Sequence, residues 1–155
     1  MNVAKYLTEQ SIDYDVITHR DAYDAQRLAA AIHVSGKEVA KTVLLRTDSG
    51  QYVVAVVPAN LTINLLEVAD MLHETGVGLA SEREIVKQCP DCERGVLPPF
   101  GSQYGMETIV DESLTEDFEI VFEGNTHHEA IRMRMDDYRR MEQPRIGNFT
   151  HKSYF

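Results

Sequence analysis

The sequence has no long apolar run, and this lack limits where the protein can work. No stretch of its 155 residues approaches the roughly 18 consecutive apolar residues of a membrane-spanning helix. Residues 1–10 are polar and mixed, and they lack the apolar segment of a secretory signal peptide. We therefore expect a cytoplasmic protein with no membrane partner.

Positive charge is also scarce. The chain has 15 Lys and Arg residues against 25 Asp and Glu residues, which gives a net charge of −10. A protein that wraps long nucleic acid needs a basic surface to neutralise the phosphates. This balance argues against a DNA-binding groove, and we expect no DNA partner. It leaves room for a small site that holds individual phosphate groups.

Cysteine is limited to Cys89 and Cys92, in the sequence CPDC. A structural zinc site needs a second pair of ligands. His127 and His128 could supply this pair only if the fold brought them close to the cysteines. A redox C-x-x-C motif usually opens a helix after a strand, whereas this pair follows the end of a predicted helix. We expect two reduced cysteines in a loop, and a small redox or zinc protein remains an alternative.

Length and composition indicate one domain, because 43% of the residues are apolar and can form a core. We assign residues 1–143 to this domain and expect residues 144–155, which show no periodicity, to form a flexible tail. Helices and strands do not alternate regularly, and two hairpins are predicted. This order is typical of an α+β fold with a mixed, mostly antiparallel sheet and flanking helices.

The predicted elements follow from periodicity and from capping residues. Asn64 and Ser81 each begin a helix, since a glutamate follows each of them three residues later. Tyr52–Val57 is apolar at nearly every position and is expected to be a central strand covered on both faces. Helices are expected at 3–10, at 24–33 with Gly36 as the stop, after Asn64, after Ser81, and at 136–143 with Asp136 or Asp137 as the cap. Strands are expected at 13–19, on both sides of Asp48–Gly50, and at 106–111, 118–124 and 129–135.

Two features stand out from this framework. Residues 95–105 read GVLPPFGSQYG, and this density of glycine and proline excludes a helix or central strand and predicts a stiff, shaped loop. Lys41 enters an apolar strand and shares a face with Val43 and Leu45. Lysine is rarely buried without a partner. Lys41 either extends into water from the end of its strand or forms a cation in a cleft that binds an anion.

These features together resemble the YbaK/ProX family of aminoacyl-tRNA editing domains. The resemblance rests on VAKTVLL at 39–45, on Gly95-x-x-x-Pro99 followed by Phe100-Gly101, and on Gly124 with His127 after a late strand. It covers the chain from about His19 to Met135. It implies a free-standing aminoacyl-tRNA deacylase, which hydrolyses the ester between a wrong amino acid and the 3′-terminal adenosine of a tRNA.

The resemblance also implies residue roles and partners. Lys41 would hold the phosphate or ribose of the terminal adenosine, Gly95 would place water and the scissile carbonyl with its backbone groups, and Pro99 would stiffen the loop. It assigns Lys41, Gly95 and Pro99 to catalysis, and His19, Thr42, Phe100, Gly101, Gly124 and His127 to substrate binding. The reaction would use no metal, no cofactor and no protein nucleophile. The partners would be the acceptor end of tRNA and an aminoacyl-tRNA synthetase.

One alternative keeps the fold and Lys41 without the reaction. In it the protein is a non-catalytic binding module that recruits a synthetase or another protein. The sequence CPDCERG before the loop and LPPFG within it differ from the cysteinyl- and alanyl-specific branches of the family. The cognate amino acid therefore stays open, and so does the choice between His127 and His128 for the amino-acid pocket.

Overall fold

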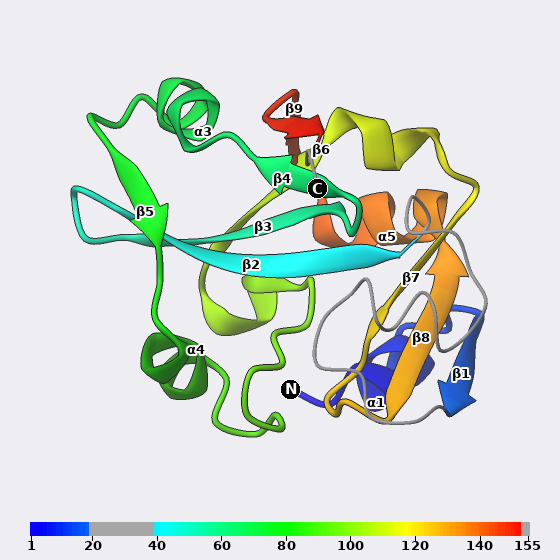
Figure 1. Ribbon diagram of the computed structural model, residues 1–155. Coiled ribbons are helices and arrows are strands. Elements are labelled where there is room, and N and C mark those ends of the chain that lie inside the picture. Colours follow the sequence, from blue (N-terminus) through cyan, green and yellow to red (C-terminus); the bar gives the residue numbers. More distant parts are fainter. Residues whose placement is uncertain (19–38, 153–155) are drawn as a thin grey trace.

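The largest sheet of the molecule has five strands and runs through its centre (Figure 1). The computed structural model describes residues 1–18 and 39–152. In spatial order the sheet consists of β5 (Val77–Leu79), β2 (Ala40–Thr47), β3 (Tyr52–Pro58), β6 (Glu107–Asp111) and β9 (Arg145–Gly147). β2 is antiparallel to both β3 and β5, whereas β6 is parallel to β3 and β9. The sheet is therefore mixed, as the sequence predicts.

A second sheet has three antiparallel strands in the order β1-β8-β7. Its members are β1 (Tyr14–Thr18), β7 (Glu119–Glu123) and β8 (Glu129–Arg134). An isolated parallel bridge from Val39 to Val121 joins the start of β2 to β7. The strands β4 (Leu61–Ile63) and β10 (Thr150–Lys152) form a further antiparallel pair. The antiparallel pairs outnumber the parallel ones, which confirms the predicted α+β class, although the strands form separate sheets.

β3 is the best-covered strand of the central sheet. All its residues from Val53 to Val57 are at most 3% exposed, and they alternate between two apolar cores. Val54 lies in a core with Leu44 and with Phe100 of the Gly/Pro loop. Val53 lies in the other core, with Val68, which belongs to the helix Leu65–Leu72. The Gly/Pro loop is therefore packed against the sheet itself.

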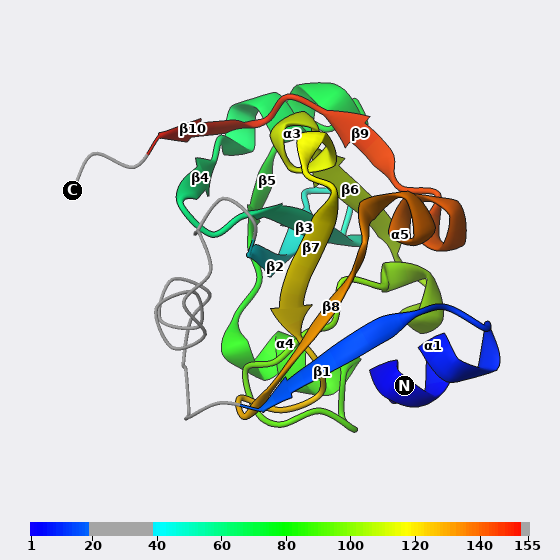
Figure 2. The same ribbon diagram turned by 90° about the vertical axis from the view of Figure 1, so that its right-hand side faces the viewer.

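Four α-helices are described: α1 (Val3–Glu9), α3 (Leu65–Leu72), α4 (Glu82–Gln88) and α5 (Met135–Glu142). Two short 3-10 helices accompany them, η1 (Gly101–Tyr104) and η2 (Glu112–Glu116). The described helices lie around the sheets, with α1 beside β1 and α3 at the opposite end of the molecule (Figures 1 and 2). This arrangement agrees with the predicted flanking helices.

The predicted caps of α3 and α4 are confirmed. The Asn64 side chain accepts hydrogen bonds from the N–H groups of Leu66 and Glu67 at 3.1 and 3.3 Å. Ser81 and Glu84 form a reciprocal capping box. Hydrogen bonds from the Ser81 N–H and from the Tyr52 hydroxyl lower the pKa of Glu84 to about 2. The Tyr52 contact also ties α4 to β3, which fixes the helix that leads into Cys89.

The predicted cap of α5 is wrong. The N-cap is Arg134, which makes no side-chain capping bond, and Asp136 and Asp137 both lie in the first helical turn. Carboxylates in the first turn still favour the helix, because its N-terminal end carries partial positive charge. The helix begins one residue earlier than predicted, at Met135, because that side chain is buried at the end of β8.

The prediction of a flexible tail at residues 144–155 is also corrected, because residues 145–147 and 150–152 form strands. Arg145–Gly147 pairs with β6, and Thr150–Lys152 pairs with β4. Phe149 between them is 1% exposed, and its backbone bonds Asp111 and Asn64. Burial of this one aromatic ring holds the segment on the molecule (Figure 2). Strands of three residues are too short to show a periodic pattern in the sequence.

The predicted helix at 24–33, its stop at Gly36 and the candidate residue His19 lie outside the described residues. In the described ranges, no helix combines the length and the apolar character that crossing a membrane requires.

Candidate functional site

The Gly/Pro loop begins with one exposed residue, which a buried segment follows. Gly95 is exposed and has a φ of +86°, whereas every residue from Val96 to Phe100 is buried. A positive φ is strained for any residue with a Cβ, which explains glycine at this position. The loop thus presents the Gly95 backbone to solvent from a segment that is anchored in the core.

Aromatic side chains anchor the middle of the loop. The Phe100 ring is fully buried and meets the rings of Tyr6, Phe122 and Tyr138 edge-to-face, with centroids 5.5–5.7 Å apart. The Tyr138 hydroxyl donates to the carbonyl oxygen of Pro99 at 2.6 Å. Burial raises the pKa of Tyr138 well above its ordinary value, so the phenol stays neutral and keeps the proton it donates. Pro99 and Phe100 therefore hold the loop in place and do not face solvent.

A buried carboxylate holds the end of the loop. Glu142 is 8% exposed, and it accepts hydrogen bonds from the Ser102 N–H, the Ser102 hydroxyl and the Thr108 hydroxyl at 3.0, 2.6 and 2.6 Å. The Gly101 N–H donates to the Thr108 oxygen at 3.0 Å, and a Cβ on Gly101 would lie 2.6 Å from that oxygen. Gly101 is therefore required by close packing, not by contact with a ligand.

Glu142→Gln is expected to lower the free energy of unfolding by about 1.5 kcal/mol, since it removes a charge-assisted acceptor from buried donors. Chemical denaturation measures this loss. Asp136→Asn on the same helix removes an exposed carboxylate and should leave stability within about 0.5 kcal/mol of wild type. Equal stability of both variants would contradict the anchoring role of Glu142.

His127 is the buried histidine next to the exposed end of the loop. Its Nε2 lies 2.8 Å from the carbonyl oxygen of Arg94, and its Nδ1 lies 3.2 Å from a carboxylate oxygen of Glu123. A carbonyl oxygen can only accept, so Nε2 carries a hydrogen. The 3.2 Å contact of Nδ1 with Glu123 is an ion pair only when the ring is protonated. The bond of Nε2 to the Arg94 carbonyl fixes the orientation of the ring in either state.

Backbone contacts fix His127 and distinguish it from its neighbour. The His127 N–H donates to the Glu93 carboxylate at 2.8 Å, and the Glu93 N–H donates to the carbonyl oxygen of Asn125 at 2.8 Å. His127 is 7% exposed, whereas His128 is exposed. The structure thus brings His127, not His128, to the Gly/Pro loop.

Gly95, His127 and Glu123 form what we call the Gly95 corner. A Cβ placed on Gly95 would lie 3.7 Å from Nε2 of His127. Among the described residues, no group accepts a hydrogen bond from the Gly95 N–H. In a trans peptide the C=O and the N–H point in opposite directions. His127 binds the carbonyl oxygen of the peptide between Arg94 and Gly95. The N–H of that peptide belongs to Gly95 and therefore points away from His127.

Lys41 is the second residue of β2. Both Lys41 and Thr42 are half-buried, and alternation directs Thr42 to the core that contains Phe100, whereas Lys41 takes the other face with Val43. An isolated parallel bridge joins Val39 to Val121, so Lys41 and Glu123 each follow this bridge by two residues.

Gly124 has a different function. It is buried, its N–H donates to the carbonyl oxygen of Glu129 at 3.0 Å, and a Cβ would lie 3.6 Å from Ile131. It closes the hairpin between β7 and β8 and so places His127. Of the predicted site residues, Gly95 and His127 lie next to each other, and the contacts of Pro99, Phe100, Gly101 and Gly124 hold the loops in place.

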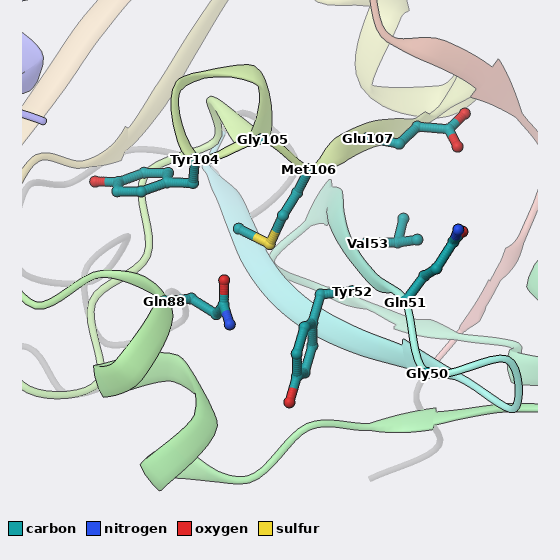
Figure 3. A pocket seen from close by; sticks show the side chains of 9 residues that line it. All are labelled: Gly50, Gln51, Tyr52, Val53, Gln88, Tyr104, Gly105, Met106 and Glu107. Atoms are coloured by element: carbon teal, nitrogen blue, oxygen red, sulfur yellow. The ribbon is translucent and has the colours of Figure 1, made fainter.

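A pocket of about 410 Å³ lies elsewhere, between the β2–β3 turn, η1 and the start of β6 (Figure 3). The side chains of Tyr52, Gln88, Tyr104 and Met106 contribute to its lining, and none of the predicted site residues does. The Tyr104 hydroxyl points away from the other labelled side chains (Figure 3). The predicted site is therefore not this hollow.

The sequence analysis missed two carboxylates of the site. Glu123 was part of a predicted strand, although a carboxylate at a strand end four residues before a histidine is a usable signal. Glu142 was part of the terminal helix, and its partner Ser102 lies forty residues away in the sequence, so no local pattern could have indicated it.

Comparisons with known proteins identify the family of the chain. A family model described as an aminoacyl-tRNA editing domain matches residues 19–141. The multifunctional Ser/Thr-tRNA deacylase ProXp-y of Escherichia coli (strain K12) is 25% identical over 147 residues, which cover 92% of this chain and 87% of that protein. The proline–tRNA ligase of Bacillus subtilis (strain 168) is 26% identical over 114 residues, or 72% of this chain and 20% of the ligase.

Solved structures show the same fold. The hypothetical protein APE2540 superposes with a TM-score of 0.87 at 16% identity, and the match covers 96% of this chain and 99% of that one. A protein described as a trans-editing enzyme for prolyl tRNA synthetase superposes with a TM-score of 0.83 at 15% identity, over 96% and 94% of the two chains.

Proposed function

The chain belongs to the aminoacyl-tRNA editing domain family, and from this premise we propose that it hydrolyses the ester bond of mischarged aminoacyl-tRNA at the 3′-terminal adenosine. It would act as a deacylase in the cytoplasm, where aminoacyl-tRNAs are made. The similar E. coli protein is named as a Ser/Thr-tRNA deacylase, which makes seryl and threonyl esters the first substrates to test.

The observation that carries the proposal is the open N–H of Gly95. Ester hydrolysis passes through a tetrahedral intermediate, and a preorganised donor aimed at its oxyanion is among the largest catalytic contributions. Gly95 offers such a donor on a fixed loop, with no side chain to keep the substrate away. Its exposed backbone also suits the placement of the attacking water.

His127 supports this donor through the peptide it binds. Nε2 of His127 donates to the Arg94 carbonyl, which polarises that peptide group and strengthens the hydrogen bond that its N–H can give. A carboxylate oxygen of Glu123 lies 3.2 Å from Nδ1 and helps to hold the ring. In this account His127 and Glu123 are positioning residues, because they act on the substrate through the Arg94–Gly95 peptide.

Lys41 supplies the contact with the nucleotide. A lysine ammonium is a compact point charge that suits a phosphate, and Lys41 lies two residues after the bridge between Val39 and β7, the strand that ends at Glu123. With a net charge of −10, the chain lacks the positive surface that a whole tRNA would need. We therefore limit the contact to the acceptor end and propose that a synthetase delivers the tRNA.

A deacylation panel tests this function. Purified protein is mixed with tRNAs mischarged with serine, threonine, alanine or cysteine, and the release of each amino acid is measured against the spontaneous rate. We expect accelerated release from at least one substrate. If no ester is hydrolysed faster than without the protein, the chain is the non-catalytic binding module, which a binding assay with aminoacyl-tRNA synthetases would then examine.

A further inference from the structure

The cysteine pair is joined, contrary to the expectation of two reduced loop cysteines. A disulfide links Cys89 and Cys92, in the turn that ends α4 and leads to Gly95. Cys89 is 2% exposed, whereas Cys92 is partly exposed. A thiol that approaches from solvent therefore reaches the sulfur of Cys92 first. The two sulfurs therefore differ in their access to solvent. In thiol–disulfide exchange one sulfur is attacked and the other departs, and this difference decides which is which.

A pocket of about 360 Å³ opens at Cys92 and is lined by Arg83, Val86, Cys92 and Arg94. Arg94 pairs with Glu82 at 2.9 Å in an exposed contact, and Arg83 makes no ion pair with another described residue. Exposed pairs of this kind are weak and exchange readily with other anions. Arg83 and Arg94 thus bring two guanidinium groups to the pocket, beside the carboxylates of Glu82, which pairs with Arg94, and of Asp91, which lies 4.0 Å from Sγ of Cys92.

The buried sulfur has a donor for the charge that develops on it. The Tyr104 hydroxyl lies 3.0 Å from Sγ of Cys89. Burial and the neighbouring Asp91 carboxylate raise the pKa of Tyr104 above its ordinary value, so the phenol is neutral. Its one hydrogen can be donated either to Asp91 or to a thiolate at Cys89. The Asp91 carboxylate, 3.6 Å from the same sulfur, opposes this charge, but the ammonium group of Met1 binds Asp91 and compensates it.

We propose that Cys89 and Cys92 form a reversible thiol–disulfide centre that is opened at Cys92 by a small anionic thiol held between Arg83 and Arg94. The structure contains the three parts that such a centre needs: an accessible sulfur, a cationic pocket beside it and a hydrogen-bond donor at the departing sulfur. The chemical class of the ligand is a thiol that carries carboxylates. This activity goes beyond the proposed function and does not depend on it.

The exchange has two balanced steps. The external thiolate attacks Sγ of Cys92, a new S–S bond forms, and the Cys89–Cys92 bond breaks with its electron pair on Cys89, which leaves as a thiolate and then takes a proton from water. A second external thiolate attacks the mixed disulfide at the sulfur of the first thiol. Cys92 is released as a thiolate, and the external thiols leave as their own disulfide.

The test uses the full chain, oxidised in air, and two reducing probes without tRNA. Glutathione carries carboxylates, and 2-mercaptoethanol is uncharged. Free protein thiols are alkylated at set times and counted by mass spectrometry. At equal thiolate concentration we expect glutathione to reduce the disulfide about tenfold faster at low salt, a typical effect of electrostatic attraction. The difference should shrink in 0.5 M NaCl, since salt screens exposed charges.

Charge variants locate the effect. Arg83→Gln and Arg94→Gln are each expected to remove most of the preference for glutathione. Lys87→Gln is the control, because it also removes one positive charge from α4, the helix that carries Arg83, and Lys87 does not line the pocket. This variant should keep the preference for glutathione. Equal rates with both probes in the wild-type chain, or loss of the preference in all three variants alike, would overturn the anionic-thiol assignment.

Two further outcomes bear on the centre itself. A purified chain that keeps two free thiols in the presence of oxidised glutathione contradicts a reversible disulfide. Cys89, Cys92 and Asp91 also offer ligand atoms within 4.8 Å of one another. One zinc ion retained per chain after reduction and gel filtration would replace the redox assignment with a metal site.

Discussion

Gly95→Ala is expected to lower the single-turnover rate of deacylation about a hundredfold, which is typical when reacting groups are misplaced by about 1 Å. The new methyl group would lie 3.7 Å from Nε2 of His127, where it would stand between the loop and an approaching ester. A φ of +86° is also strained for alanine, so the peptide that carries the Gly95 N–H should turn. Quenched single-turnover assays on the best substrate of the panel measure the rate.

Gly50→Ala is the matched control for this variant. Gly50 has a φ of +89° and open space around its missing Cβ, so alanine there imposes the same backbone strain far from the corner. Both variants should lose roughly 1–2 kcal/mol of stability, and only Gly95→Ala should lose activity. Full activity of Gly95→Ala would refute the catalytic role of the loop, and equal inactivity of both variants would reduce the effect to general destabilisation.

Lys41→Ala is expected to lower kcat/KM roughly 10- to 150-fold, since a hydrogen bond to a charged group contributes about 1.5–3 kcal/mol. The fold should persist because Lys41 is the second residue of β2 and only half-buried. The loss should diminish as salt is raised, because screening weakens the phosphate contact in the wild type. Steady-state deacylation at two ionic strengths, together with thermal unfolding, measures these effects.

Arg46→Ala serves as the control, because it removes a cation from the other end of the same strand. Arg46 is exposed and lies 3.7 Å from Glu84, in a pair that should contribute little to stability. Its deacylation should match wild type. A Lys41→Ala variant that keeps full activity would exclude Lys41 from the reaction, and one that unfolds would show that Lys41 has a structural role.

Much of the fold could be predicted because the signals involved are local. The β2–β3 hairpin follows from two apolar runs around Asp48–Gly50, and the caps Asn64 and Ser81 depend on residues within one helical turn. The tail could not be predicted in this way. Its strands are held by the burial of Phe149, which is a contact between distant parts of the chain.

The candidate site was predictable in part for the same reason. The backbone freedom of Gly95 can be predicted from its loop, and its positive φ agrees with that prediction. The burial of Pro99 and Phe100 depends on Tyr138, some forty residues later, so no local pattern could have predicted these contacts. Cysteine spacing alone does not set the distance between two sulfurs, and the turn after α4 brings them together.

The most direct test of the central claim is the rate at which seryl- or threonyl-tRNA releases its amino acid in the presence of the purified chain. The account predicts multiple turnovers with the wild-type protein, retained turnover with Gly50→Ala, and a rate near the spontaneous one with Gly95→Ala. Release by the wild type that does not exceed spontaneous hydrolysis, with these substrates and with the rest of the panel, would contradict it.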